Sequence, residues 1–175
     1  MRLFIAICLS DPVKDAVGRV INDMKRSGAR GKYTVPENMH LTLAFIGETD
    51  RIRDIEEALD DVEFESFELA LSGFGHFGNL YWVGLDRQPA LTLLAREIRK
   101  ALDDYGIPFD RKPFKAHITA ARRVESRQPV RVRIPDASMK VTAFSLMRSQ
   151  RVKNRMVYTE LERWEAKDLS PGEWL

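Results

Sequence analysis

Two segments of the chain repeat the same order of apolar and polar positions. The first opens with the apolar run Leu3 to Leu9, which is followed by a helical pattern with Asp11 as N-cap and Gly28 as its stop. The second begins about 77 residues later, with the strand Leu80 to Leu85 and a helix that starts at Pro89. This spacing indicates an internal repeat of strand and helix.

The remainder of the chain reads mostly as strands. A short helix is predicted over Ile52 to Leu59. Strand-like patterns cover Phe64 to Leu71, Val130 to Ile134, Val141 to Met147 and Met156 to Leu161. Strands mixed with two long helices predict an α+β fold, and the repeat suggests two pseudo-symmetric lobes. We therefore expect residues 1–175 to form a single domain of two intertwined lobes, each an antiparallel-type sheet with helices outside, facing across a central cleft.

Composition narrows the class of protein. The chain has 175 residues, of which 44% are hydrophobic and 31% charged, as in folded globular domains. No apolar run approaches the roughly 20 residues of a membrane-spanning helix, and the N-terminal apolar run reads as a strand and not a signal peptide. The single cysteine, Cys8, excludes an internal disulfide and a cysteine metal cage and favours a reducing, cytoplasmic setting. We expect a monomer.

The net charge of +2 hides a strong asymmetry along the sequence. Between Arg111 and Arg155 there are 13 Lys and Arg residues, against only Glu125 and Asp136. An excess of this kind suits an anionic partner such as nucleic acid, although the same charges are also compatible with several separate solvated faces.

Each repeat also contains the tripeptide pattern His-x-Thr, four residues after a proline. The two copies are His40-Leu41-Thr42 and His117-Ile118-Thr119. Because side chains alternate along a strand, the histidine and threonine of each copy share one face while the residue between them points into the core. If the lobes face each other, two imidazoles and two hydroxyls line one cleft.

This arrangement suits a phosphodiester. One imidazole can take a proton from water while the other gives a proton to the departing oxygen, and the threonine hydroxyls can donate to the non-bridging oxygens. No metal or other cofactor is required. Arg122 is a further candidate phosphate ligand. Strict alternation after His117 turns it away from the cleft, so either a β-bulge or the strand end would have to bring it back, or it contacts the substrate beyond the scissile phosphate.

The sequence resembles the 2H phosphoesterase superfamily, specifically the bacterial and archaeal 2′-5′ RNA ligase family of RNA 2′,3′-cyclic phosphodiesterases. The resemblance is carried by RLFIAI at Arg2–Ile7, PENMHLTLAFIGE at Pro36–Glu48 and HITAAR at His117–Arg122. The second motif departs from the family at Ala120, where leucine is usual, which we expect to change core packing and not chemistry.

The resemblance implies hydrolysis of RNA 2′,3′-cyclic phosphate ends to 2′-phosphates, with reversible 2′-5′ ligation in some members. It implies that His40 is the proton donor and His117 the proton acceptor, whereas the residues alone do not order the two roles. The implied partner is RNA with a cyclic phosphate end, including tRNA fragments. Phe74 and Phe77 are candidates for stacking on a base, with core packing as the alternative.

Three other interpretations keep part of this site. The substrate could be a small cyclic nucleotide or an ADP-ribose cyclic phosphate. The chain could be a non-catalytic RNA-binding module. The basic residues Arg148, Arg151, Lys153 and Arg155 could steer an RNA backbone or form a solvated hairpin turn. A metal site on the two histidines is the weakest interpretation, since neither motif supplies a third ligand.

Overall fold

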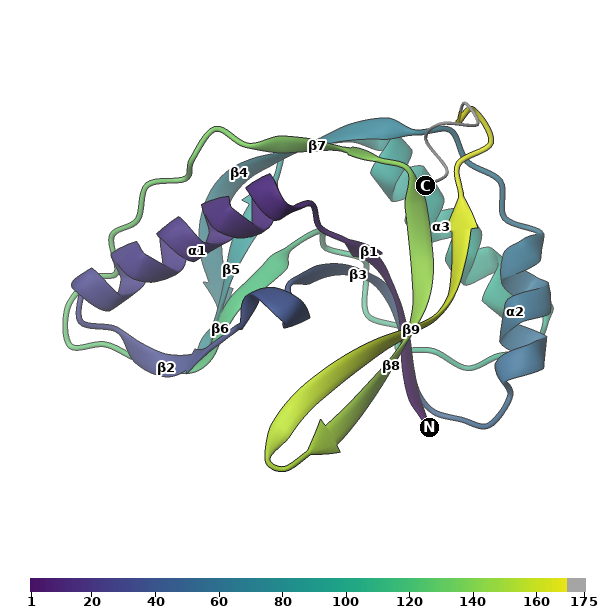
Figure 1. The fold of residues 1–175 in the computed structure, drawn as a ribbon, viewed down its shortest axis with the longest axis horizontal. Helices are drawn as coiled ribbons and strands as arrows, with labels where there is room; N and C mark the ends of the chain where they lie inside the picture. Colours follow the sequence, from purple (N-terminus) through teal and green to yellow (C-terminus); the bar gives the residue numbers. More distant parts are fainter. Residues whose placement is uncertain (170–175) are drawn as a thin grey trace.

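The computed structural model describes residues 1–169 and has two antiparallel sheets that lie side by side (Figure 1). One sheet has four strands in the order β3-β1-β8-β9, and the other has five in the order β2-β6-β5-β4-β7. The strands are β1 (Arg2–Cys8), β2 (Arg30–Tyr33), β3 (His40–Glu48), β4 (Phe67–Phe77), β5 (Leu80–Leu85), β6 (Ile118–Glu125), β7 (Ser138–Val141), β8 (Ala143–Val152) and β9 (Arg155–Glu165). The helices are α1 (Asp11–Arg26), the short 3-10 helix η1 (Pro36–Asn38), α2 (Ile52–Asp60) and α3 (Pro89–Asp104). The predicted α+β fold of two lobes is confirmed.

Each copy of the repeat supplies two neighbouring strands of one sheet. In the first, β1 and β3 are antiparallel neighbours on either side of α1 in the sequence. In the second, β5 and β6 are antiparallel neighbours on either side of α3. Each His-x-Thr pattern therefore lies at the start of the strand that follows the helix of its repeat, although β3 is an edge strand of its sheet and β6 is covered by β2.

Each of the two long helices packs against the sheet that does not contain the strand before it. Helix α1 follows β1 of the four-stranded sheet but packs against β6 and β7 of the five-stranded sheet, whereas α3 follows β5 and packs against β3. The apolar faces of these helices are buried, with Val17, Val20 and Met24 of α1 and Leu94 and Ile98 of α3 almost completely inaccessible. Burial of such side chains contributes about 1.5–3 kcal/mol each, so this arrangement couples the packing of one lobe to that of the other.

Three local predictions are wrong. The N-cap of α1 is Ser10, whose Oγ accepts from the N–H of Val13 at 3.4 Å, and Asp11 is already the first helical residue. Strand β4 continues to Phe77, because Gly73, with a φ of 83°, allows a bulge that keeps the chain paired with β5. The segment 130–134 forms no strand, although its apolar residues Val130, Val132 and Ile134 pack against the core.

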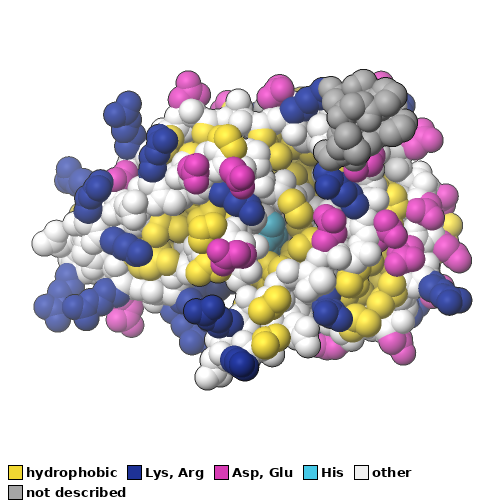
Figure 2. All heavy atoms as spheres, in the orientation of Figure 1, with side chains coloured by type: hydrophobic (Ala, Val, Ile, Leu, Met, Phe, Trp, Pro, Cys, Tyr) yellow, Lys and Arg dark blue, Asp and Glu magenta, His cyan; other side chains and the backbone are white. Residues whose placement is uncertain are grey.

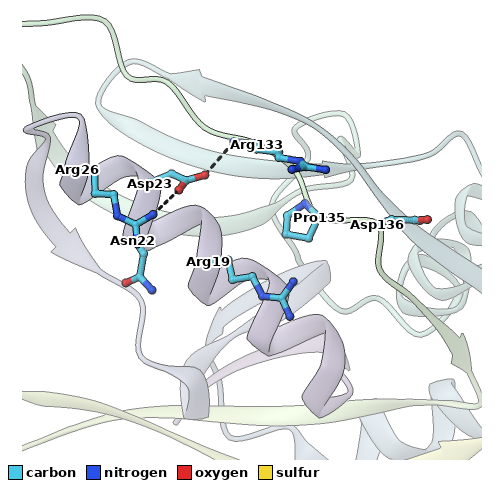
Figure 3. Close-up of a pocket in the computed structure, with 7 residues that line it drawn as sticks. All are labelled: Arg19, Asn22, Asp23, Arg26, Arg133, Pro135 and Asp136. Carbon is cyan, nitrogen blue, oxygen red and sulfur yellow. Dashed lines mark hydrogen bonds and ion pairs between the residues drawn. The ribbon is translucent and has the colours of Figure 1, made fainter.

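The segment 130–134 is held on α1 by the carboxylate of Asp23. Asp23 accepts from the backbone N–H of Arg133 at 3.0 Å and pairs with the guanidinium of Arg26 at 3.3 Å (Figure 3). These residues border a hollow of about 470 Å³ whose charged lining is of mixed sign and includes neither His-x-Thr pattern. Among residues 1–169, no helix is long and apolar enough to cross a membrane.

Candidate active site

The two His-x-Thr patterns meet at the cleft between the sheets. His40 begins β3, and His117 immediately precedes β6. Backbones of these strands approach each other to within 8 Å between Cα atoms. The charge of His117 also contributes to lowering the pKa of His40, so the two imidazoles are close enough for their charges to interact. In the space-filling view a histidine side chain is visible near the centre of the face, between the lobes (Figure 2).

Both imidazoles are held by the same local hydrogen bond. Nδ1 of His40 lies 2.7 Å from the carbonyl oxygen of Asn38, and Nδ1 of His117 lies 2.6 Å from the carbonyl oxygen of Lys115. A carbonyl oxygen only accepts, so Nδ1 carries the proton in each ring. Each Nε2 is therefore the nitrogen left to exchange a proton with a substrate, in both halves of the site.

The surroundings of His40 disfavour its charged form. Its ring packs between Phe4 and Tyr158, with centroid distances of 4.8 and 5.1 Å. Burial lowers the pKa of His40 below its usual value of 6.5, and the positive charges of Arg122 and His117 lower it further, against the opposing effect of the hydrogen bond to Asn38. In the unliganded protein this imidazole is therefore mainly neutral at pH 7.

The threonines stand beside the histidines with their hydroxyls available. Thr42 pairs with Ala6 of β1, and Thr119 pairs with Trp82 of β5, and both are half-buried. Within residues 1–169 neither hydroxyl has a hydrogen-bond partner, and neither is sealed from solvent. Two donors are thus open to an anion in the cleft.

A bulge at the same place in both motif strands decides where Arg122 lies. In β6 the register moves from Trp82 opposite Thr119 to Tyr81 opposite Ala121, so Ala120 is the extra residue. In β3 the extra residue is Leu43, which occupies the corresponding place in the first repeat. In each bulge two consecutive residues are buried. The alternation of side chains between the two faces therefore resumes one position later, and the next side chain points to the cleft face. That side chain is Arg122, and its charge reaches His40.

Neutralising Arg122 should raise the pKa of His40. In Arg122→Gln the nearby positive charge is gone, so protonation of the His40 imidazole costs less. An NMR titration of the three histidines should show the midpoint of His40 moving to higher pH. The matched control is Arg123→Gln, which removes the same charge from the adjacent position and should leave His40 where it was. An unchanged midpoint in Arg122→Gln would contradict the placement of this side chain.

The two candidate stacking residues are separated by the sheet. Phe77 lies on the cleft face, edge-on to the ring of His117 at 5.3 Å, and is 42% exposed. Phe74 packs against Tyr81 and the main core instead. Phe74 and Phe77 are three positions apart on β4, and side chains an odd number of positions apart point to opposite faces of a sheet. Only Phe77 is thus in a position to meet a ligand.

Sequence reasoning missed three aromatic residues of the cleft. Phe4 and Tyr158 enclose His40, as described above. Trp82 lies beside Thr119, and its indole Nε1 is buried without a hydrogen-bond partner in the described part of the chain. The indole fits because its neighbours Gly75 and Gly84 have no side chain, and a Cβ at Gly75 would lie 2.5 Å from the ring. The two glycines that make room for the indole were the sequence feature that could have identified Trp82 as a residue of the cleft.

Charge is distributed unevenly around the cleft. Lys and Arg gather over the lobe that holds α1 and around the β8–β9 hairpin, whereas Asp and Glu gather over the lobe that holds α2 and α3 (Figure 2). In residues 1–169, no three His, Cys, Asp or Glu side chains come together as metal ligands would. The cleft itself therefore offers positive charge and hydrogen-bond donors, a combination that binds anions.

The chain is similar to known proteins over most of its length. The sequence model of the 2′-5′ RNA ligase superfamily matches residues 12–153. An RNA 2′,3′-cyclic phosphodiesterase of Archaeoglobus fulgidus is 36% identical over 137 residues, which is 74% of this chain and 76% of the relative. One of Thermotoga maritima is 36% identical over 131 residues, 70% of each chain. The crystal structure of Escherichia coli LigT complexed with 3′-AMP superposes with a TM-score of 0.80 at 28% identity, covering 95% of this chain and 98% of that one. By sequence and by structure, the chain belongs to the 2′-5′ RNA ligase superfamily.

Proposed function

We propose that this protein hydrolyses the 2′,3′-cyclic phosphate at the 3′ end of RNA and leaves a 2′-phosphate. The observation that carries the proposal is the matched pair of imidazoles, each anchored through Nδ1 to a backbone carbonyl two residues earlier, which leaves each Nε2 free of that bond. Relatives that are 36% identical are named RNA 2′,3′-cyclic phosphodiesterases, and they support the same substrate here.

The reaction is an in-line displacement at phosphorus. Water attacks the phosphorus atom, and Nε2 of His117 accepts its proton. The bond from phosphorus to the 3′-oxygen breaks, and Nε2 of His40 donates a proton to that oxygen. The products are a 2′-phosphate monoester and a free 3′-hydroxyl. Two opposed imidazoles suit this geometry because nucleophile and leaving group lie on opposite sides of phosphorus.

The low pKa of His40 couples its role to substrate binding. A donor must be protonated, but in the free protein burial and the charges of Arg122 and His117 oppose protonation. The negative charge of a bound phosphate acts in the opposite direction and raises the pKa of His40. His40 therefore becomes a competent donor when the anion is in place.

The remaining cleft residues stabilise charge on the phosphoryl group. The hydroxyls of Thr42 and Thr119 donate to the non-bridging oxygens, where negative charge increases in the transition state. Arg122 adds a guanidinium, which binds phosphate oxygens in pairs. Phe77 offers its exposed ring, next to His117, to the base or ribose of the terminal nucleotide.

The same displacement also accounts for 2′-5′ ligation. If the 5′-hydroxyl of a second RNA takes the place of water, His117 accepts its proton and the 3′-oxygen leaves as before. The product is a 2′-5′ phosphodiester. Only the nucleophile differs, so water at its normal concentration makes hydrolysis the main outcome.

An assay with a defined product tests the proposal. Purified protein incubated in EDTA with an oligonucleotide ending in a 2′,3′-cyclic phosphate should produce a 2′-phosphate, identified by 31P NMR. In water enriched in 18O one label should enter the phosphate, because the attacking oxygen comes from water. His117→Asn protein prepared in the same way is the control for contaminating nucleases. A 3′-phosphate product, or no product between pH 5 and 9, would overturn the proposal.

A further inference from the structure

A second cavity lies at one end of the four-stranded sheet, where β1 begins and β3 ends. It has a volume of about 470 Å³ and is formed where the start of β1 meets the β8–β9 hairpin. Three arginines line it, Arg2, Arg148 and Arg151, together with Ser149. The only acidic residue in its lining, Glu48, is 79% exposed, and its carboxylate is 3.4 Å from the amino group of Met1. The cavity is therefore strongly electropositive.

Two polar atoms of this lining have no partner. Nε of Arg148 and Oγ of Ser149 are both buried, and neither makes a hydrogen bond within residues 1–169. Buried polar atoms of a folded protein are normally paired, because an unmet donor costs free energy. Ser149 is opposite Arg2 in the register and shares a sheet face with Arg151, whereas Arg148 is opposite Leu3 and points to the other face. An unmet hydroxyl beside Arg2 and Arg151 is a donor set that a phosphate group satisfies.

A row of aromatic rings connects this cavity to the catalytic histidine. The guanidinium of Arg2 lies over the ring of Phe45 at 4.9 Å, and Phe45 is paired in register with Phe4, whose ring is 4.8 Å from that of His40. Arg2 and Phe4 are two residues apart on one strand face, a step of about 6.6 Å. The cavity thus begins on the order of 12 Å from His40, within reach of the nucleotides that precede the RNA end.

The hairpin holds the arginines in fixed positions. Strands β8 and β9 stay paired up to Val152 and Arg155, and the turn between them has only two residues, Lys153 and Asn154, with φ of 50° and 63°. Positive φ at both positions is the tight turn that fits the twist of paired strands. The hairpin projects from the body of the molecule (Figure 1), and no acidic residue occurs from position 148 to 157.

We propose that this cavity is a second phosphate subsite, which binds an internucleotide phosphate of the RNA upstream of the cyclic end. Arg151 and Ser149 hold the phosphate oxygens, and Arg2 covers the aromatic row along which the intervening nucleotide lies. The inference rests on the proposed function and adds a substrate class to it: oligoribonucleotides are preferred over cyclic mononucleotides.

The test compares two substrates in matched variants. In Arg151→Gln and in Ser149→Ala, KM for a cyclic-phosphate trinucleotide should rise on the order of tenfold, the loss typical of one charge-assisted contact. The kcat/KM for the corresponding cyclic mononucleotide should not change. Lys153→Gln removes the same charge from the hairpin turn, outside the cavity, and should have little effect on either substrate.

Substrates with one uncharged methylphosphonate linkage locate the phosphate. Replacement of the bound phosphate should weaken the wild type and cause no further loss in Arg151→Gln. Equal losses in Lys153→Gln, or equal losses with the mononucleotide, would overturn the subsite and leave the proposed function intact. If the wild type hydrolyses neither substrate, the proposed function fails. Fluorescence anisotropy with a 2′-phosphorylated trinucleotide then decides the subsite separately, because Arg151→Gln must weaken that binding.

Discussion

Replacing either His40 or His117, the proposed proton donor and acceptor, with asparagine is expected to reduce turnover by about 10²–10⁴-fold, the range for removal of a general acid or base. Asparagine suits the test because its side-chain amide can still donate to the carbonyl that holds Nδ1, that of Asn38 for position 40 and of Lys115 for position 117. It has no titrating nitrogen in place of Nε2. The substitution therefore removes the proton transfer and keeps the local structure.

The third histidine is a matched control for these variants. His76 holds the same kind of hydrogen bond, from Nδ1 to the carbonyl oxygen of Gly78 at 2.9 Å, but it stacks on Tyr81 away from the cleft face. His76→Asn should retain wild-type kcat in the cyclic-phosphate assay. The two catalytic substitutions together should cost much less than the product of the single losses, because both serve one step. A kcat in His117→Asn within tenfold of the wild type would contradict the mechanism.

The centre of the site was predictable because local rules determine it. The alternation of a strand puts His40 with Thr42 and His117 with Thr119 on one face, whatever the rest of the chain does. The internal repeat then places both pairs at corresponding positions of two lobes. The family resemblance supplied the assignment of proton donor and proton acceptor. The residues alone do not give this assignment, because the two halves of the site are pseudo-symmetric.

What the sequence did not reveal depends on contacts between distant segments. The bulge that returns Arg122 to the cleft is visible only as a register shift against β5. The enclosure of His40 requires Tyr158, which is 118 residues away in the sequence and arrives on the last strand. Likewise, α1 follows β1 in the sequence but packs on the other sheet. The amphipathic pattern of a helix shows which face is apolar, but not which sheet that face will contact.

The threonine hydroxyls should be the next most important groups, with a loss in kcat of about 10²-fold in Thr42→Val or Thr119→Val, the lower end of the range for removal of one oxyanion donor. Valine has nearly the same shape and the same preference for strands, so the sheet is retained. Because charge on the non-bridging oxygens grows only toward the transition state, the loss should fall on kcat and leave KM almost unchanged. Steady-state kinetics on a cyclic-phosphate trinucleotide separate the two parameters.

Serine and a neighbouring threonine provide the controls for this prediction. Thr42→Ser and Thr119→Ser keep the hydroxyl and should recover most of the activity. Thr34 donates its hydroxyl to the backbone carbonyl of Thr119 at 3.0 Å, so Thr34→Val removes a structural bond at the same residue. That variant should lose about 1 kcal/mol of unfolding free energy, measured by urea denaturation, while its kcat stays near that of the wild type. If serine failed to rescue, or if Thr34→Val lowered kcat as far as Thr119→Val, the hydroxyls would be supports of the strand and not donors to the phosphate.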